Sequence, residues 1–219
     1  MIEKPVITKE CVKPLLETPF LNVADLQYAE GRHYYDATRH KLGEITATLT
    51  DEEFKAMTAD AVTMTVIVKT PDEEPRLLLF YEYRYPTGRF LLSPPAGLMD
   101  PEDKNSDDPI RQTAVRELFE ETGIRFGEKD SLHVISPVLF SSPGMTDECN
   151  AFVCAVVNLP DLSSLSQTHG QGSECFDGFS LLTRDEAREI LRNGRDPYGN
   201  FFSIYTWGAL MYFVSGMWE

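Results

Sequence analysis

The chain has no apolar run approaching the roughly 20 residues that a helix needs to cross a bilayer. Its first ten residues, MIEKPVITKE, lack the apolar core of a signal peptide, and we therefore expect a cytoplasmic protein. The four cysteines (Cys11, Cys149, Cys154 and Cys175) form no CxxC pair and lie too far apart for a zinc knuckle, which favours reduced thiols. Internal repeats and low-complexity tracts are also absent from the sequence.

Positive charge is scarce as well. Twenty Lys and Arg residues face 35 Asp and Glu residues, a net charge of −15, which argues against a nucleic-acid partner because phosphate backbones are held largely by Lys and Arg. An acidic chain can still bind a phosphate anion, through a few local arginines or through divalent cations held by clustered carboxylates. A hydrophobic content of 42% indicates a globular core rather than disorder.

The pattern of residues changes near position 55. Residues 1–55 read as a polar, β-rich arm, with a hairpin of residues 21–28 and 32–39 around Glu30 and Gly31. Residues 56–219 read as the main domain. β-branched and apolar runs predict further strands at 61–69, 76–84, 89–93, 133–140, 151–157 and 179–182. Helices are predicted at 109–122, 184–192 and 203–217, so we expect an α/β layered fold.

The helix at 109–122 has clear boundaries. Asp108 suits the N-cap, Pro109 suits the first helical position, and Gly123 suits a left-handed residue after the end. Glu117 and Glu121 lie roughly 40° apart on this helix, with Glu120 about 60° to the other side. Like charges in one arc repel, and Glu121 falls within the apolar side, where an unpaired carboxylate is costly. Hard oxygen ligands in such a cluster favour Mg²⁺ or a similar ion.

The segment from Arg116 to Ile124, RELFEETGI, resembles the Nudix box, G-x5-E-x7-R-E-U-x-E-E-x-G-U, where U is a bulky apolar residue. All nine of its positions fit the motif. Upstream, the residue seven places ahead of Arg116 is Asp108 rather than Glu, and ten residues separate it from Gly97 where the family has five. We therefore expect a five-residue insertion in the loop PEDKNSDD, with Asp108 as N-cap and as a weaker partner of Arg116.

The resemblance implies an α-β-α sandwich with a mixed sheet, the Nudix fold, and hydrolysis of a phosphoanhydride. It implies Mg²⁺ as cofactor, with Mn²⁺ as the alternative, held by Glu117, Glu120, Glu121 and the carbonyl of Ala96 beside Gly97. Arg116 would orient Glu117 through an ion pair.

Three flanking segments resemble the ADP-ribose pyrophosphatase subfamily. They are Pro94–Asp100 (PPAGLMD), Ser142–Glu148 (SPGMTDE) and Tyr83–Pro86 (YRYP). The resemblance implies a nucleoside-diphosphate sugar as substrate, above all ADP-ribose, which would give AMP and ribose 5-phosphate. It assigns Arg84, Met145 and, from the arm, Arg39 to substrate binding, and adenine stacking to Tyr34 or Tyr35 if these are not core aromatics. In the relatives the arm crosses to a second subunit, so a homodimer is expected.

A general base is still required. In the subfamily it is a glutamate in a loop before a late strand, which points to Glu174, with Asp177 and Glu148 as alternatives. The catalytic set expected from the resemblance is therefore Glu174, Glu120 and Arg116.

The sequence is also compatible with two other functions. One is hydrolysis of a GDP- or UDP-sugar or a dinucleoside polyphosphate. The other is a non-catalytic ADP-ribose sensor, which would tend to lose box carboxylates and carry a DNA-binding extension. The three intact glutamates and the apolar C-terminal segment IYTWGALMYFVSGMW favour an enzyme.

Overall fold

A computed structural model describes residues 4–167 and 174–219. The chain divides into two compact units. The small unit consists of residues 1–60 and 138–150, and the large unit consists of residues 61–137 and 151–219. The small unit thus combines the N-terminal arm with a segment that lies far from it in the sequence.

The secondary structure follows the predicted order and adds short elements to it. The predicted strands appear as β2 (Asn22–Ala29), β3 (Arg32–Thr38), β4 (Ala61–Lys69), β5 (Arg76–Arg84), β6 (Arg89–Ser93), β8 (Ser131–Phe140), β9 (Cys149–Asn158) and β10 (Phe176–Leu182). The predicted helices appear as α3 (Pro109–Thr122), α4 (Arg184–Asn193) and α5 (Ile204–Ser215). The short elements that local patterns do not predict are β1 (Val12–Glu17), β7 (Ala96–Leu98), α1 (Asp51–Ala56), α2 (Pro101–Lys104) and the 3-10 turns η1 (Lys9–Cys11) and η2 (Thr46–Thr48).

The small unit is built on an antiparallel sheet in the order β1-β2-β3. The predicted hairpin is confirmed, and Gly31 turns the chain with a φ of 65°, a conformation that costs a glycine little. Ala24, Leu26 and Ile45 form its small buried core. The segment 138–150 is fastened to β3, because Ala37 donates its N–H to the carbonyl of Met145 at 3.0 Å.

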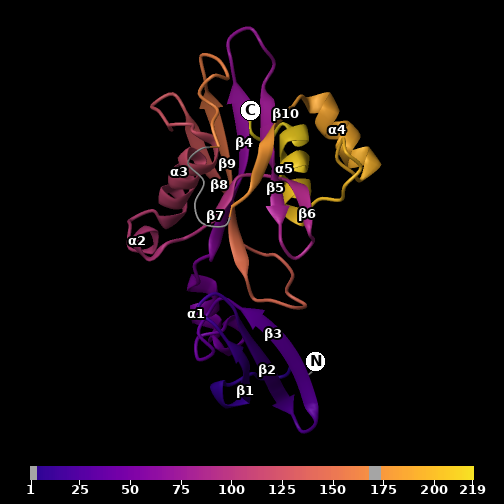
Figure 1. Cartoon of the computed structure of the whole chain (residues 1–219). Coiled ribbons are helices and arrows are strands. Elements are labelled where there is room, and N and C mark those ends of the chain that lie inside the picture. Colours follow the sequence, from indigo (N-terminus) through magenta and orange to yellow (C-terminus); the bar gives the residue numbers. More distant parts are fainter. Residues whose placement is uncertain (1–3, 168–173) are drawn as a thin grey trace. The chain divides into compact units, whose positions relative to one another are not determined.

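The large unit contains a sheet in the order β10-β5-β4-β9-β8, with β6 paired to β5 and β7 paired to β4. Central strands β4 and β9 are buried along almost their whole length, as their continuous apolar sequences predict. Helices lie on both faces of this sheet, with α3 on one side and α4 and α5 on the other (Figure 1). The fold is the expected α-β-α sandwich with a mixed sheet.

One face of the sheet packs against α5 through a core that includes Leu79, Phe152, Leu210 and Phe213. Because side chains alternate along a strand, the other face is left for α3, whose Ala114 and Leu118 are fully buried. Within the described residues, no helix combines the length and the hydropathy needed to cross a lipid bilayer.

The ends of α3 are those predicted. The side chain of Asp108 accepts a hydrogen bond from the N–H of Arg111 at 3.2 Å, and Gly123 ends the helix with a φ of 75°. These two caps fix the register of the helix, and therefore determine which face each glutamate occupies.

Candidate active site

The glutamates of α3 differ sharply in their surroundings. Glu117 and Glu121 are 6% and 3% exposed, whereas Glu120 is only partly buried. The prediction that Glu121 lies on the apolar side of the helix is confirmed. Two carboxylates therefore lie one helical turn apart in a largely dry environment, where their charge is costly unless a donor or a cation meets it.

Strand β7 provides the surface against which these two carboxylates lie. Ala96 donates its backbone N–H to Oε2 of Glu121 at 2.9 Å. A Cβ atom added to Gly97 would lie 1.8 Å from Oε1 of Glu117. Only a residue without a side chain therefore lets the backbone of β7 approach the helix this closely.

Arg116 connects the acids of α3 to the loop before it. Its Nη1 contacts Oε1 of Glu117 at 2.7 Å and Oε2 of Glu120 at 3.0 Å. Its Nη2 donates to Oδ2 of Asp103 at 2.7 Å and to the carbonyl of Leu98 at 2.9 Å. The planar guanidinium uses both ends of its fork and thereby fixes the position of the Glu117 carboxylate.

The predicted partnership of Asp108 with Arg116 is wrong, because the acid that holds Arg116 is Asp103 on α2. Asp103 is buried and, counted from Gly97, occupies the sixth position, where the Nudix box has its first Glu. The five extra residues therefore follow Asp103 rather than precede the box acid. A count forward from Gly97, instead of backward from Arg116, would have identified it.

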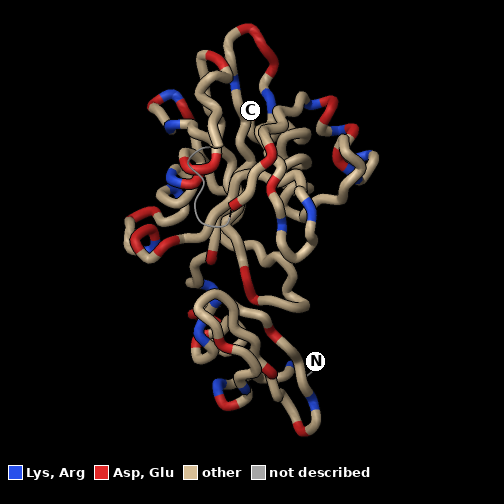
Figure 2. Tube along the Cα trace, viewed as in Figure 1, with Lys and Arg blue, Asp and Glu red and all other residues tan. Residues whose placement is uncertain are grey.

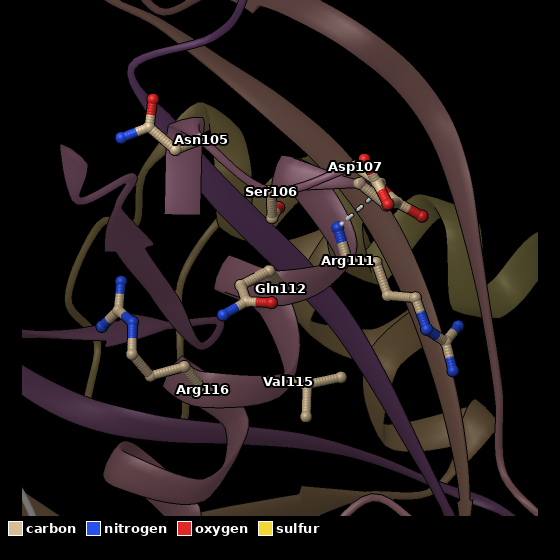
Figure 3. A pocket seen from close by; sticks show the side chains of 8 residues that line it. Asn105, Ser106, Asp107, Arg111, Gln112, Val115 and Arg116 are labelled. Carbon is tan, nitrogen blue, oxygen red and sulfur yellow. Dashed lines mark hydrogen bonds between the residues drawn. The ribbon is translucent and has the colours of Figure 1, made fainter. Parts of the chain in front are cut away.

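The loop that carries these extra residues borders a hollow of about 750 Å³ beside the first half of α3, lined by Asn105, Ser106, Arg111 and Arg116, among others (Figure 3). Glu117 and Glu121 are not among the residues that line this hollow. Figure 2 shows acidic positions grouped along α2 and the loop after it. The loop with the five extra residues thus forms part of the rim next to Arg116.

Burial makes the buried acids hard to ionise. Burial raises the pKa of Glu117 to about 7, a rise opposed by Arg116 and increased by the charges of Glu120 and Glu174. Burial, followed by the charge of Glu117, raises the pKa of Glu121 well above its usual value. Burial alone would also raise the pKa of Asp103, but hydrogen bonds from Arg116 and from the N–H of Asp100 bring it below its usual value.

A further acid, Glu82, joins the site from the end of β5. Its side chain is 14% exposed, and its Oε2 lies 2.7 Å from Nη2 of Arg84, the arginine expected to grip the substrate. Burial, opposed by Arg84, raises the pKa of Glu82, and the charge of Glu82 in turn raises that of Glu121. Glu82 was not predicted as a site residue, although it immediately precedes the YRYP segment.

Glu174, the candidate base, is exposed and lies just ahead of β10. The pairing of β10 with β5 places Phe176 opposite Glu82, which brings this segment to the end of β5. The charge of Glu174 contributes to the raised pKa values of Glu82, Glu117 and Glu121. Glu174 therefore lies close to three acids from two other elements of the large unit. Residues 168–173, which precede Glu174 and include the glycines expected beside it, fall outside the described residues.

The remaining expected substrate-binding residues belong to the small unit. Arg39 pairs with Glu148, with Nε and Oε2 separated by 2.9 Å. Met145 is exposed, and Tyr34 donates its hydroxyl hydrogen to the carbonyl of Gly144 at 2.8 Å. These contacts hold the SPGMTDE segment against β3.

The donors in the large unit suit a hard divalent cation. They are carboxylate oxygens, two of them from buried side chains, and the charge of one, Glu117, raises the pKa of the other, Glu121. Among the described residues, however, no three side chains of His, Cys, Asp or Glu already surround a single point.

Comparison with known proteins identifies the family of the chain. Residues 59–200 match the model of the NUDIX domain family, and the chain belongs to that family. It is 31% identical over 115 residues to putative nudix hydrolase 2 of Caenorhabditis elegans, an alignment that covers 52% of this chain and 43% of that protein. It is 33% identical over 100 residues to an uncharacterized Nudix hydrolase of Schizosaccharomyces pombe, covering 46% and 44% respectively.

These alignments span less than half the length of either curated relative. Among solved structures, the chain is similar to a crystal structure of an ADP compounds hydrolase, with a TM-score of 0.59 and 20% identity. That comparison covers 100% of this chain and 95% of the other. At this identity the likeness concerns the fold alone.

Proposed function

We propose that this protein hydrolyses the diphosphate of a nucleoside-diphosphate sugar, with ADP-ribose as the preferred substrate, in a reaction that requires Mg²⁺ or Mn²⁺. The observation that carries the proposal is the pair of buried carboxylates, Glu117 and Glu121, set against the backbone of Ala96 and Gly97. A buried acid pair of this kind is costly to the fold and has a clear use as a cation site.

Each neighbouring residue has a part in this proposal. Glu117, Glu120, Glu121 and the carbonyl of Ala96 hold the cation. Arg116, itself held by Asp103, keeps Glu117 in place as a positioning residue. A bound divalent cation neutralises charge on the diphosphate and makes a water molecule easier to deprotonate.

The chemical step uses one water molecule. Glu174 accepts a proton from this water, and the water oxygen attacks one phosphorus of the diphosphate. The bond between that phosphorus and the bridging oxygen breaks, so ADP-ribose and water give AMP and ribose 5-phosphate. Arg84, which is nearly half exposed, grips the diphosphate with the same guanidinium that pairs with Glu82.

The preference for ADP-ribose is supported by the segments PPAGLMD, SPGMTDE and YRYP. The ADP compounds hydrolase that shares the fold is named for substrates of the same kind, but a similarity limited to the fold does not carry its substrate to this chain. The homodimer expected from the resemblance belongs to the same proposal.

The test is a panel of ADP-ribose, GDP- and UDP-sugars, dinucleoside polyphosphates and nucleoside triphosphates, incubated with Mg²⁺ or Mn²⁺ and analysed by product chromatography. We expect ADP-ribose to be cleaved fastest, with no cleavage when EDTA is present. Rapid cleavage of another member without cleavage of ADP-ribose would refute the substrate assignment. Failure to cleave any diphosphate would refute the enzyme assignment.

A further inference from the structure

The small unit contains a cavity of about 250 Å³ whose two acids have no assigned role, although Tyr34, Tyr35 and Met145 in its lining were expected to contact the substrate. Its walls come from β2, β3, η2, the end of β8 and the segment after β8, all within the small unit. The lining residues are Leu26, Tyr34, Tyr35, Asp36, Thr46, Ala47, Phe140, Pro143, Met145, Thr146 and Asp147.

Two carboxylates lie in this otherwise mostly apolar cavity. Asp36 is only 7% exposed, and its Oδ2 atom is buried without a hydrogen-bond partner among the described residues. Oδ1 of Asp147 is likewise buried and unpartnered within that part of the chain. Polar atoms hidden from water nearly always have a partner, so two unpartnered carboxylate oxygens in one cavity point to a missing donor.

The other bonds of this cavity fix its shape. Oδ2 of Asp147 accepts the N–H of Thr46 at 2.9 Å, which ties η2 to the segment after β8. The hydroxyl of Tyr34 ties β3 to the same segment at Gly144. The two free oxygens are therefore held in place before any ligand arrives, which lowers the entropic cost of binding.

The chemistry of the missing donor follows from the lining. Two carboxylates favour a positively charged ligand, and a chain with a net charge of −15 attracts cations in general. Leu26, Phe140 and Pro143 give the cavity apolar walls, which suit the body of an organic cation better than the water molecules that a hydrated Mg²⁺ or Ca²⁺ would bring. The volume is below the roughly 300 Å³ of a drug-sized site, so the ligand is about one ring in size.

We propose that this cavity binds a small organic cation, an amidinium or ammonium group on a flat apolar body, with the charged group against Asp36 and Asp147 and the body against Leu26 and Phe140. A planar amidinium can donate to both carboxylates at once, which gives strong charge-assisted hydrogen bonds. The proposal does not rest on the proposed hydrolysis, because Asp36 and Asp147, the two acids that carry it, have no part in that reaction.

Benzamidine and its neutral counterpart benzamide provide a matched pair of probes. Each would be titrated into the ¹⁵N-labelled full chain while the amide signals of Thr46 and Ala47 are followed by NMR. We expect benzamidine to shift these signals in a saturable manner and benzamide to bind at least ten-fold more weakly. Benzoate, an anion of similar size and shape, should leave them unchanged, because the acids repel it.

Substitutions distinguish specific recognition of benzamidine in the cavity from a general attraction to negative charge. Asp36→Asn should weaken benzamidine binding by about ten-fold or more, whereas Glu44→Gln, which removes an exposed acid of the same unit, should not change it. Ala47→Leu keeps both acids but places a larger side chain in the cavity, so it should also abolish binding. This second variant tests the proposal even if Asp36→Asn fails to fold. Equal binding of benzamide, displacement by benzoate, unchanged binding by Ala47→Leu or no saturable shift with benzamidine would each overturn the proposal.

Discussion

The backbone of Gly97 lies directly against the carboxylate of Glu117, so closely that a Cβ atom on Gly97 would lie 1.9 Å from Cδ of Glu117. This contact joins β7 to α3 and sets the distance between the carbonyl of Ala96 and the acids of the helix. Since Glu117 is also held by Arg116, it has little room to move away.

Gly97→Ala should therefore displace Glu117 and impair the site. We expect the rate of diphosphate cleavage to fall about 100-fold, as misplacement of about 1 Å costs this much in other enzymes, together with a lower melting temperature. Gly127→Ala is the matched control, because its new Cβ would meet Oδ2 of Asp130 at an ordinary 3.6 Å. Similar rates for the wild type and Gly97→Ala would show that the close contact has no bearing on catalysis.

Asp103 and Asp108 can be distinguished by substitution. Asp103→Ala leaves Arg116 without its buried acid, and we expect a loss of about 2–3 kcal/mol in unfolding free energy together with a large loss of activity. Asp108→Ala removes only an N-cap and should cost about 1 kcal/mol while activity is retained. Urea unfolding and initial rates measure both effects. The reverse order of losses would restore Asp108 as the partner of Arg116.

The contrast between these two acids shows which parts of the molecule could be predicted from sequence. The strands and helices of the large unit follow local patterns, and Asp108, Pro109 and Gly123 mark the ends of α3 almost to the residue. The partner of Arg116 depends on where an insertion falls. That position is fixed by the packing of α2, whose four residues are too few to give a periodic pattern.

Other features depend on contacts between distant residues. Residues 138–150 belong to the small unit because of hydrogen bonds such as that from the N–H of Ala37 to the carbonyl of Met145. No local sequence pattern predicts such a bond. Glu82 and the Glu174 segment meet because of the register between β5 and β10. A carboxylate at the end of a strand is common in sequences, and only the pairing of the strands shows that this one faces other acids.

Glu174→Gln tests the candidate general base. Because Glu174 is exposed, the exchange should leave the melting temperature unchanged while kcat falls by about 10²- to 10⁴-fold, with a smaller effect on KM. Asp177→Asn, at an exposed position three residues later, is the control and should keep most of the activity. If Asp177→Asn is inactive and Glu174→Gln is active, Asp177 is the base instead.

The small unit should respond to pH through Asp36. Burial, followed by the charge of Asp147, raises the pKa of Asp36 to about 6, against the opposing influence of the N–H of Asp147 and of His40. Since the folded state binds this proton more tightly than the unfolded chain, Asp36 destabilises the unit above about pH 6. This penalty fades as the pH falls toward 4.

Asp36→Asn should accordingly stabilise the small unit at pH 7.5, by on the order of 1–2 kcal/mol, with a smaller gain at pH 5. Urea unfolding at the two pH values, followed through amide signals of the small unit, measures the difference. Asp25 provides the contrast, because hydrogen bonds from Gln27 and His33 lower its pKa despite the opposing effect of burial. Asp25→Asn should destabilise the unit at pH 7.5, and stabilisation by this control would contradict the electrostatic explanation.

The most direct measurement compares the wild type with Glu121→Gln in the cleavage of ADP-ribose at saturating Mg²⁺. The wild type should release AMP and ribose 5-phosphate. The variant should be at least 10³-fold slower without a lower melting temperature, because a neutral amide replaces a buried carboxylate that is hard to ionise. Equal rates for the two proteins, or a wild type that releases no AMP, would contradict the conclusion that the buried acids of α3 hold the cation on which the reaction depends.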